Sequence, residues 1–224
     1  MTSPSDASAA RSQVWTRKHL LGLEDLTAEE ITLILDQAAE FKAECLQGDT
    51  KLDLLTGSVV ANLFFEPSTR TRTSFSLAAK RLSADTIDFT SSGSSLSKGE
   101  TFIDTARNIE AMLPDILVLR HASAGATDFL ARHCSAAVVN AGDGAHEHPT
   151  QTLVDLYTIL KEKGSIKGQT VALFGDLLHA RTVHSLAYAL ARFGAKVRTI
   201  TLPDLGLPTY VRSRLQSIGC DLQE

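Results

Sequence analysis

SVVANLFFEPSTRTRTSF, residues 58–75, joins a run of apolar residues to a polar segment that contains two arginines. Residues 58–65 are rich in β-branched and aromatic side chains and follow Gly57, which predicts a buried strand. Apolar residues then recur at helical spacing, which predicts a helix with Ser68 or Thr69 as its N-cap. A strand that leads through a short turn into a helix is typical of an α/β fold with a parallel sheet.

Arg70 and Arg72 fall in the first turn of this predicted helix. Exposed cations there oppose the helix dipole and destabilise the helix by about 0.3–1 kcal/mol each. A bound anion would instead stabilise the helix start. Free N–H groups, serine and threonine hydroxyls and a guanidinium together are suited to bind phosphate. The alternative is a solvated helix start, because serine and threonine are common capping residues.

The composition restricts the classes of protein that this chain can belong to. It has 224 residues, of which 43% are hydrophobic, enough for one large or two small α/β domains. A net charge of -4 argues against a general nucleic-acid binder. The three cysteines form no CxxC pair, which argues against a metal knuckle or a disulfide framework. Without a signal-peptide core or an 18-residue apolar run, we expect a cytoplasmic protein that does not enter a membrane.

Strands alternate with helices along the chain, beginning with a helix opened by the capping box Thr27-x-x-Glu30. The predicted strands are residues 58–65, 86–89, 115–119, 136–139, 170–174 and 196–201. One of the predicted helices runs from about residue 100 to Leu113, where Pro114 stops it. We expect a flexible tail (1–12), a first domain (13–150) and a partial second domain (151–224). The second series has only two clear strands and stops where a third would begin, so we expect a truncated chain.

Unusual polar segments follow the predicted strands. Ligands of open parallel sheets bind at the carboxyl ends of the strands, so these segments are expected to converge on one ligand. The segments are EPSTRT, SSLSKGE, Arg120-His121, NAGDGAHEHPTQ and GDLLHART.

Two other interpretations of these segments are weaker. His146 and His148 form an H-x-H pair that could bind zinc, but no further cluster with ligand spacing supports a metal site. A neutral His148 before Pro149 would instead present an imidazole to a polar, uncharged group. GDLLHART has one glycine where a dinucleotide-binding turn has three. Without a ligand, Arg181 would pair with nearby Asp176.

Read in order, these segments resemble the aspartate carbamoyltransferase family. FFEPSTRTRTSF is similar to its carbamoyl phosphate motif, and SLSKGET, VLRH, NAGDGAHEHPTQTLVDLYTI and VALFGDLLHARTVHSL match further segments. The match covers nearly the whole chain beyond the tail. It implies two parallel-sheet α/β domains of the aspartate/ornithine carbamoyltransferase type, the second incomplete. Ornithine carbamoyltransferase shares STRTR and HP-x-Q, but FFEPSTRT and GDLLHARTVHSL favour the aspartate enzyme.

The resemblance implies that the amine of L-aspartate attacks the carbonyl carbon of carbamoyl phosphate, an early step of de novo pyrimidine biosynthesis. It implies no metal, cofactor or covalent intermediate. Arg70 would stabilise the leaving oxygen, and Thr71, Arg120 and His148 would form an oxyanion hole around the carbonyl oxygen. The residues that would hold the phosphate are Ser68, Thr69, Arg70 and Thr71.

The resemblance also implies contacts to the rest of the substrates. Gln151 would accept a hydrogen bond from the carbamoyl NH₂, and Arg181 would bind a carboxylate of aspartate. Ser95 and Lys98 would reach into the site of a neighbouring subunit, which implies a homotrimer with shared active sites. The resemblance leaves open whether a regulatory or dihydroorotase-like partner chain binds. It implies no nucleic acid or membrane partner.

The sequence departs from the family in two ways. Residues 74–76 read SFS where the family has SFE, which we expect to be a minor change on the helix surface. The C-terminal part that carries a second aspartate-binding arginine, a proline-leucine loop and the last helix in the family is missing from this sequence. An inactive phosphate-binding fragment is therefore an alternative to an active transferase.

Overall fold

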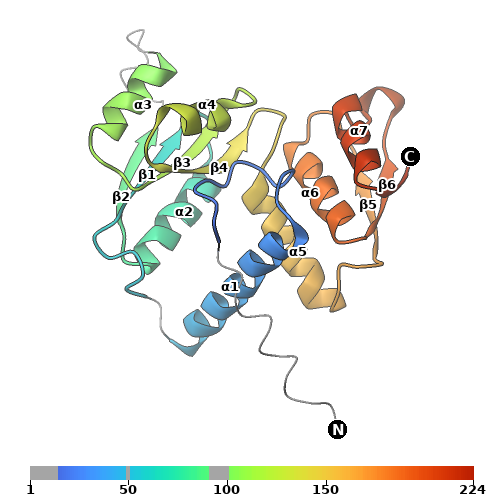
Figure 1. Ribbon diagram of the computed structural model, residues 1–224, viewed down its shortest axis with the longest axis horizontal. Helices are drawn as coiled ribbons and strands as arrows, with labels where there is room; N and C mark the ends of the chain where they lie inside the picture. The colour runs from blue at the N-terminus through green and yellow to red at the C-terminus, as the bar shows by residue number, and fades with distance from the viewer. Residues whose placement is uncertain (1–14, 49–50, 91–100) are drawn as a thin grey trace.

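The computed structural model describes residues 15–48, 51–90 and 101–224 (Figure 1). The first series of elements is α1 (Ala28–Gln47), β1 (Val59–Phe64), α2 (Thr69–Arg81), β2 (Asp85–Thr90), α3 (Phe102–Glu110), β3 (Ile116–His121), α4 (Ala126–His133), β4 (Ala137–Asp143) and α5 (Pro149–Lys163). The second series is β5 (Thr170–Phe174), α6 (Arg181–Arg192), β6 (Lys196–Ile200), a 3-10 turn (Pro203–Leu205), α7 (Thr209–Ser217) and β7 (Asp221–Gln223).

These elements form two parallel sheets, as the sequence predicts. The first has the strand order β2-β1-β3-β4 and the second β5-β6-β7. Figure 1 shows α3 and α4 on one side of the first sheet and α2 on the other. Each parallel neighbour is reached through a helix, so the strand-to-helix turns gather at the carboxyl edges.

Three predicted elements end at a different residue in the structure. The strands predicted at 115–119 and 136–139 are longer in the structure, because polar residues continue the ladder through Asn140 and Asp143, which are fully buried. The helix that follows residue 100 stops at Glu110 rather than continuing to Leu113, which is 82% exposed with a φ of 55°. The residue before a proline is disfavoured in a helix, which explains this early stop.

The hydrophobic core has a layer on each face of the first sheet and a third part that joins the two sheets. α3 and α4 pack on one face, with Ala106 and Leu130 buried against the strands. On the opposite face, α2 contributes Ala79. The third part combines α1, α5 and the helices of the second sheet, so these units share one apolar interior.

Residues 15–27, here called the amino-terminal segment, run between the two sheets before α1 begins. Leu20 donates its N–H to the Val138 carbonyl and accepts the Asn140 N–H, both at 2.9 Å, which places it beside β4. The predicted capping box at Thr27 and Glu30 is confirmed, and Arg17 Nε lies 2.6 Å from the Glu30 carboxylate.

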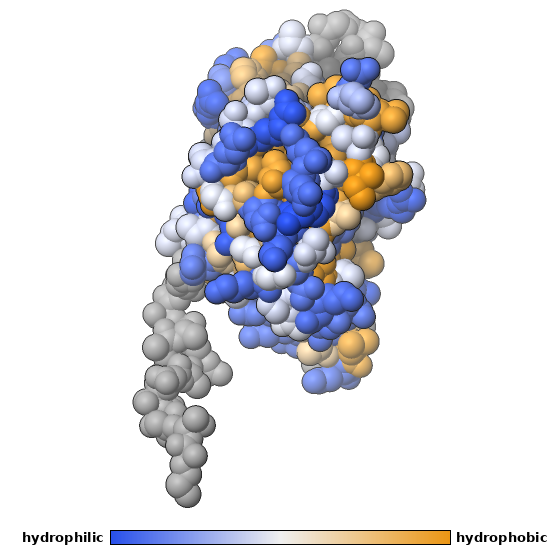
Figure 2. Space-filling model, turned by 90° about the vertical axis from the view of Figure 1, so that its right-hand side faces the viewer, coloured by the Kyte–Doolittle hydropathy of each residue, from blue (hydrophilic) through white to orange (hydrophobic). Residues whose placement is uncertain are grey.

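The second sheet leaves apolar side chains exposed at the ends of β5 and β6. Phe174, Ile200 and Leu202 are 81, 53 and 68% exposed. Figure 2 views the molecule from the side of this sheet and shows hydrophobic surface there among hydrophilic residues. None of the helices that the structure describes is long and apolar enough to cross a membrane.

Candidate active site

An open cleft of about 870 Å³ lies at the carboxyl edge of the first sheet. Three chain segments build its walls: the first half of α2 with the turn that leads into it, the end of β3 and the start of α5. The lining residues are Pro67, Ser68, Thr69, Arg70, Thr71, Ser74, Phe75, Ala78, Arg120, His148, Thr150, Gln151 and Val154. Segments that follow three different strands thus meet at one place.

The start of α2 is equipped for a ligand rather than for its own stability. Ser68 is the N-cap residue, but its hydroxyl makes no capping hydrogen bond, and the first turn has no acidic side chain. Arg70 is exposed and pairs with no carboxylate among the described residues. Arg72, from the same turn, does not line the cleft. The first-turn N–H groups, which have no intrahelical acceptor, therefore lie beside an unpaired cation.

Glu66, directly after β1, holds two guanidinium groups at the edge of the cleft. Its Oε2 atom lies 3.1 Å from Nη2 of Arg181 and 3.4 Å from Nε of Arg120. Arg181 also donates to the Gly144 carbonyl at 2.9 Å, and Arg120 donates to the Ala141 carbonyl at 3.3 Å. Burial, followed by the charge of Arg181, lowers the pKa of Arg120, although arginine stays protonated in proteins. One carboxylate therefore orients cations from both series of elements.

Gly142, near the end of β4, allows these guanidiniums to approach the backbone. Its φ of 114° lies in the left-handed region, and a Cβ there would lie 3.2 Å from Arg181 and 3.3 Å from Arg120. A larger residue would be strained and would push against both cations. Glycine at this position therefore helps to place both arginines.

His148 is the N-cap residue of α5 and is held neutral, as the sequence predicts. It is 8% exposed, and burial together with the charges of Arg120 and Arg181 lowers its pKa to about 4. Its backbone N–H donates to Ser185 Oγ at 2.9 Å, and its Nδ1 lies 3.4 Å from Thr150 Oγ1. A neutral imidazole can donate a hydrogen bond to an oxygen without adding a third positive charge.

Gln151 lies in the first turn of α5. Its Nε2 donates to Asp155 Oδ1 at 3.0 Å, which fixes the amide so that its oxygen can accept a hydrogen bond. Burial raises the pKa of Asp155, and the bond from Gln151 opposes this shift.

The charge of the cleft favours an anion. Among the described residues that line it, two are arginines and none is a carboxylate. The N-termini of α2 and α5 also border the cleft, and both add partial positive charge. The arrangement can hold a small anion with a polar, uncharged group beside it.

The remaining predicted residues have different outcomes. Ser95 and Lys98 lie outside the described residues. The ion pair expected between Arg181 and Asp176 is wrong, because Asp176 accepts from the N–H groups and the imidazole of its own loop while Arg181 reaches Glu66. His146 pairs with Asp143 at 3.0 Å, and the described residues contain no group of three or more possible metal ligands.

Two features of the site region differ from the sequence interpretation. The sequence interpretation does not predict the two ion pairs of Glu66, although its place directly after a buried strand is a usable signal. Ser76 is not a plain surface residue, because its hydroxyl donates to Asp88 at 2.8 Å and accepts from buried Asn62 at 3.1 Å. A glutamate at this position would bring a second carboxylate next to Asp88, so the departure from SFE affects the packing of α2 on β1 and β2.

Comparisons with known proteins agree with this geometry. Residues 18–161 match the family model for the aspartate/ornithine carbamoyltransferase carbamoyl-P binding domain. The aspartate carbamoyltransferase catalytic subunit of Syntrophotalea carbinolica is 55% identical over 184 residues, which are 82% of this chain and 59% of that protein. The catalytic subunit of M. jannaschii aspartate transcarbamoylase superposes with a TM-score of 0.82 at 44% identity, covering 92% of this chain and 67% of that one.

Aspartate transcarbamoylase from Trypanosoma cruzi, solved with carbamoyl phosphate and aspartate, has a TM-score of 0.86 at 36% identity over 92% of this chain and 66% of that one. This chain therefore spans about 59 to 67% of the length of these relatives. All three segments that build the cleft fall within the matched residues 18–161. The family match, the fold and the cleft together place this chain in the aspartate/ornithine carbamoyltransferase family.

Proposed function

We propose that this chain takes part in transfer of the carbamoyl group from carbamoyl phosphate to the amine of L-aspartate, giving N-carbamoyl-L-aspartate and phosphate. The observation that carries the proposal is the cleft in which Arg70 and buried, neutral His148 face one space, with no carboxylate among the described residues that line it. Relatives named for this activity, one of them solved with both substrates, support it. The chain spans 59% of the first of these relatives. That the 224-residue chain itself catalyses the reaction is therefore part of what we propose.

The phosphate would bind at the start of α2. Its oxygens would accept hydrogen bonds from the first-turn N–H groups and from the hydroxyls of Ser68, Thr69 and Thr71. Arg70 would pair with the phosphate and stabilise the charge that develops on the leaving oxygen.

The carbamoyl group would lie against β3 and α5. When the aspartate amine attacks, the carbonyl oxygen gains negative charge, which Thr71, Arg120 and His148 would stabilise as an oxyanion hole. Loss of one such donor typically lowers the rate about 10²–10³-fold. The oxygen of Gln151, fixed by the bond to Asp155, would accept from the carbamoyl NH₂.

The aspartate would approach from the side of α6. Arg181, at the first position of α6, would bind one of its carboxylates. Glu66 already neutralises part of the Arg181 charge, so a carboxylate ligand would compete with or share this contact.

We further propose the assembly that the resemblance implies. Residues 13–150 would form the carbamoyl phosphate domain and 151–224 part of the aspartate domain. A cytoplasmic homotrimer would share its sites through Ser95 and Lys98, and a regulatory or dihydroorotase-like chain is compatible with it. The product would enter pyrimidine biosynthesis.

Calorimetry and a transfer assay on the 224-residue chain test the proposal. The chain should bind inorganic phosphate and, more tightly, N-(phosphonacetyl)-L-aspartate, which occupies a T. cruzi relative. The Arg70→Ala variant should lose both, whereas Arg72→Ala, outside the cleft, should keep them. If neither ligand binds the unaltered chain, the site assignment is wrong.

The transfer assay measures carbamoyl aspartate formed from carbamoyl phosphate and L-aspartate. Binding without turnover would favour a phosphate-binding fragment, an alternative that the 59% coverage of the relative supports. Turnover with ornithine in place of aspartate would instead assign the ornithine reaction.

A further inference from the structure

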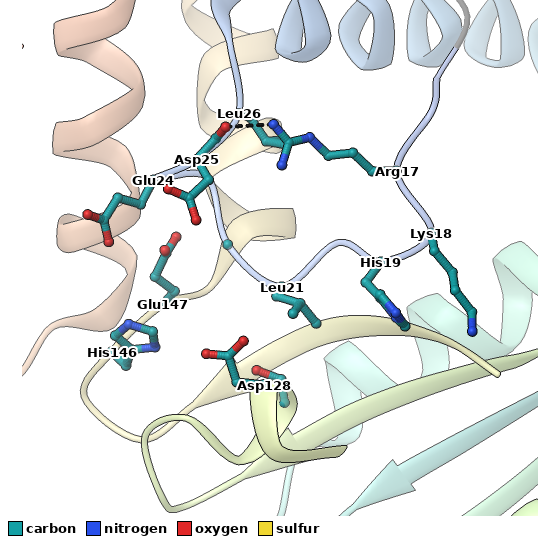
Figure 3. A pocket seen from close by; sticks show the side chains of 12 residues that line it. Arg17, Lys18, His19, Leu21, Glu24, Asp25, Leu26, Asp128, His146 and Glu147 are labelled. Carbon is teal, nitrogen blue, oxygen red and sulfur yellow. Dashed lines mark hydrogen bonds between the residues drawn. The ribbon is translucent and has the colours of Figure 1, made fainter. Parts of the chain in front are cut away.

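Glu147, the residue before His148, is a buried carboxylate that the proposed reaction does not use. It is 2% exposed, and its Oε2 accepts the Leu23 N–H at 2.7 Å and the Ser185 hydroxyl at 3.0 Å. Figure 3 shows this carboxylate at the wall of a pocket of about 330 Å³, pointing toward the part of the amino-terminal segment that carries Glu24 and Asp25. Burial raises the pKa of Glu147, and a buried polar group is costly unless it is hydrogen-bonded, so these contacts hold the carboxyl group in place.

The same carboxylate is linked to the catalytic cleft through one hydroxyl. Ser185 Oγ donates to Glu147 and accepts the backbone N–H of His148 at 2.9 Å. A continuous chain of hydrogen bonds therefore runs from Leu23 through Glu147 and Ser185 to His148. Because the bond is to the main chain of His148, it fixes where α5 begins and where the imidazole enters the cleft.

Gly22 makes room for this carboxylate. A Cβ at this position would overlap Glu147 Oε1 and lie 2.6 Å from its Cδ. The backbone of the amino-terminal segment cannot easily retreat, because Leu20 is paired with β4 on one side and Arg214 Nε holds Glu24 at 2.9 Å on the other. An added methyl group would therefore displace the carboxylate of Glu147.

We propose that Gly22 and Glu147 are positioning residues for His148: the amino-terminal segment seats the Glu147 carboxylate, which through Ser185 fixes the main chain of His148 in the cleft. The functional meaning of this device rests on the proposed reaction, in which His148 contacts the carbonyl oxygen. The alternative is that Glu147 only stabilises the junction of the two sheets.

The pKa of the His148 imidazole distinguishes these two roles. The imidazole is faced by Arg120 from β3, Arg181 from α6 and Asp143 from β4, and its low pKa depends on staying buried beside the two arginines. If His148 shifts outward, its pKa rises toward the ordinary value of about 6.5. A merely structural loss would lower stability without moving this pKa in the folded chain.

The experiment titrates histidine-labelled 224-residue chain by NMR and assigns His148 with the His148→Gln variant. Gly22→Ala, Glu147→Ala and Ser185→Ala should each raise the His148 pKa by about one unit or more. Glu147→Gln keeps an acceptor oxygen for Leu23 and Ser185 and should stay near the unaltered value. Thr27→Ala, a matched control in the same segment that touches neither residue, should lower stability and leave this pKa unchanged.

Calorimetry on the same variants separates this inference from the proposed function. Gly22→Ala and Ser185→Ala should weaken N-(phosphonacetyl)-L-aspartate binding about 10-fold and inorganic phosphate binding less, since Arg70 stays in place. If the unaltered chain binds neither ligand, the proposed function fails while the pKa result still decides the positioning. An unchanged His148 pKa in folded Gly22→Ala and Ser185→Ala would overturn the inference, even if Glu147→Ala does not fold.

Discussion

The starts of α1 and α2 are built by opposite rules. α1 begins with a complete capping box at Thr27 and has Glu29 and Glu30 in its first turn, where acidic side chains complement the helix dipole. The N-cap residue of α2, Ser68, forms no side-chain cap, and Arg70 stands at the position that Glu29 has in α1. α5 resembles α2, since its N-cap residue makes no side-chain cap either.

This difference shows which helix start serves stability and which serves a ligand. The capping box of α1 satisfies the N–H groups of Thr27 and Glu30 without a ligand. The starts of α2 and α5 have no such side-chain cap and border a common cleft, where a bound anion would stabilise them.

The largest expected effect comes from giving α2 the charge pattern of α1. Arg70→Glu should weaken phosphate binding more than about 100-fold, because it removes a charge-assisted hydrogen bond and adds repulsion. The same change should raise the free energy of unfolding by about 0.3–1 kcal/mol, since an acidic residue complements the dipole. Calorimetry and urea unfolding measure the two effects. If both affinity and stability fall, the contrast between the two helix starts does not hold.

The start of α5 should make stability depend on pH. His148 has a folded pKa of about 4 against an ordinary 6.5, so on acidification the unfolded chain takes up a proton before the folded chain does. The free energy of unfolding should therefore fall as the pH drops from about 6.5 toward 4, by about 2–3 kcal/mol from this group. Urea unfolding at the two ends of this range, in the unaltered chain and in His148→Gln, isolates the contribution. An equal loss in both proteins would contradict it.

A smaller effect should distinguish the two caps directly. Thr27→Ala removes a formed capping bond and should cost about 1 kcal/mol of stability without changing phosphate affinity. Ser68→Ala removes a hydroxyl that caps nothing, so its stability cost should stay below about 0.5 kcal/mol. Phosphate affinity should instead fall several-fold in Ser68→Ala. Thermal unfolding with and without phosphate checks the pair, and equal stability costs would argue against it.

The smallest expected effect concerns the arginine that does not line the cleft. Arg72→Ala should raise the free energy of unfolding by about 0.3–1 kcal/mol, because it removes a cation that opposes the dipole. Phosphate affinity should stay within about two-fold of the unaltered chain. A large loss of affinity in a calorimetric titration would show that Arg72 belongs to the site.

Much of the fold could be predicted because its signals are local. The β-branched run at 58–65 and the capping box at Thr27 each specify an element from a few neighbouring residues, and both are present. The ends of β3 and β4 could not be predicted in this way. Asn140 and Asp143 are polar, and part of what allows them to be buried in a strand is hydrogen bonding to partners distant in sequence, such as Leu21 and Gly125.

The site also combines features that the local sequence predicts with contacts that depend on residues distant in sequence. Arg70, Arg120 and His148 could be placed in one region because each lies at or after the carboxyl end of a strand of a parallel sheet. The contact of Arg181 with Glu66 spans 115 positions, whereas Asp176 is only five residues away, so sequence proximity favoured the wrong carboxylate. The contact of Gly22 with Glu147 has no sequence signal at all, since it depends on how the amino-terminal segment crosses between the sheets.

The pairing of Leu20 with β4 also affects how separate molecules meet. β4 is an edge strand of the first sheet, and an uncovered edge can pair with the strand of another molecule and lead to aggregation. Leu20 occupies two of its hydrogen-bonding groups, the Val138 carbonyl and the Asn140 N–H. We therefore expect the amino-terminal segment to limit such pairing, and a chain that loses this contact to expose the edge of β4 to its neighbours.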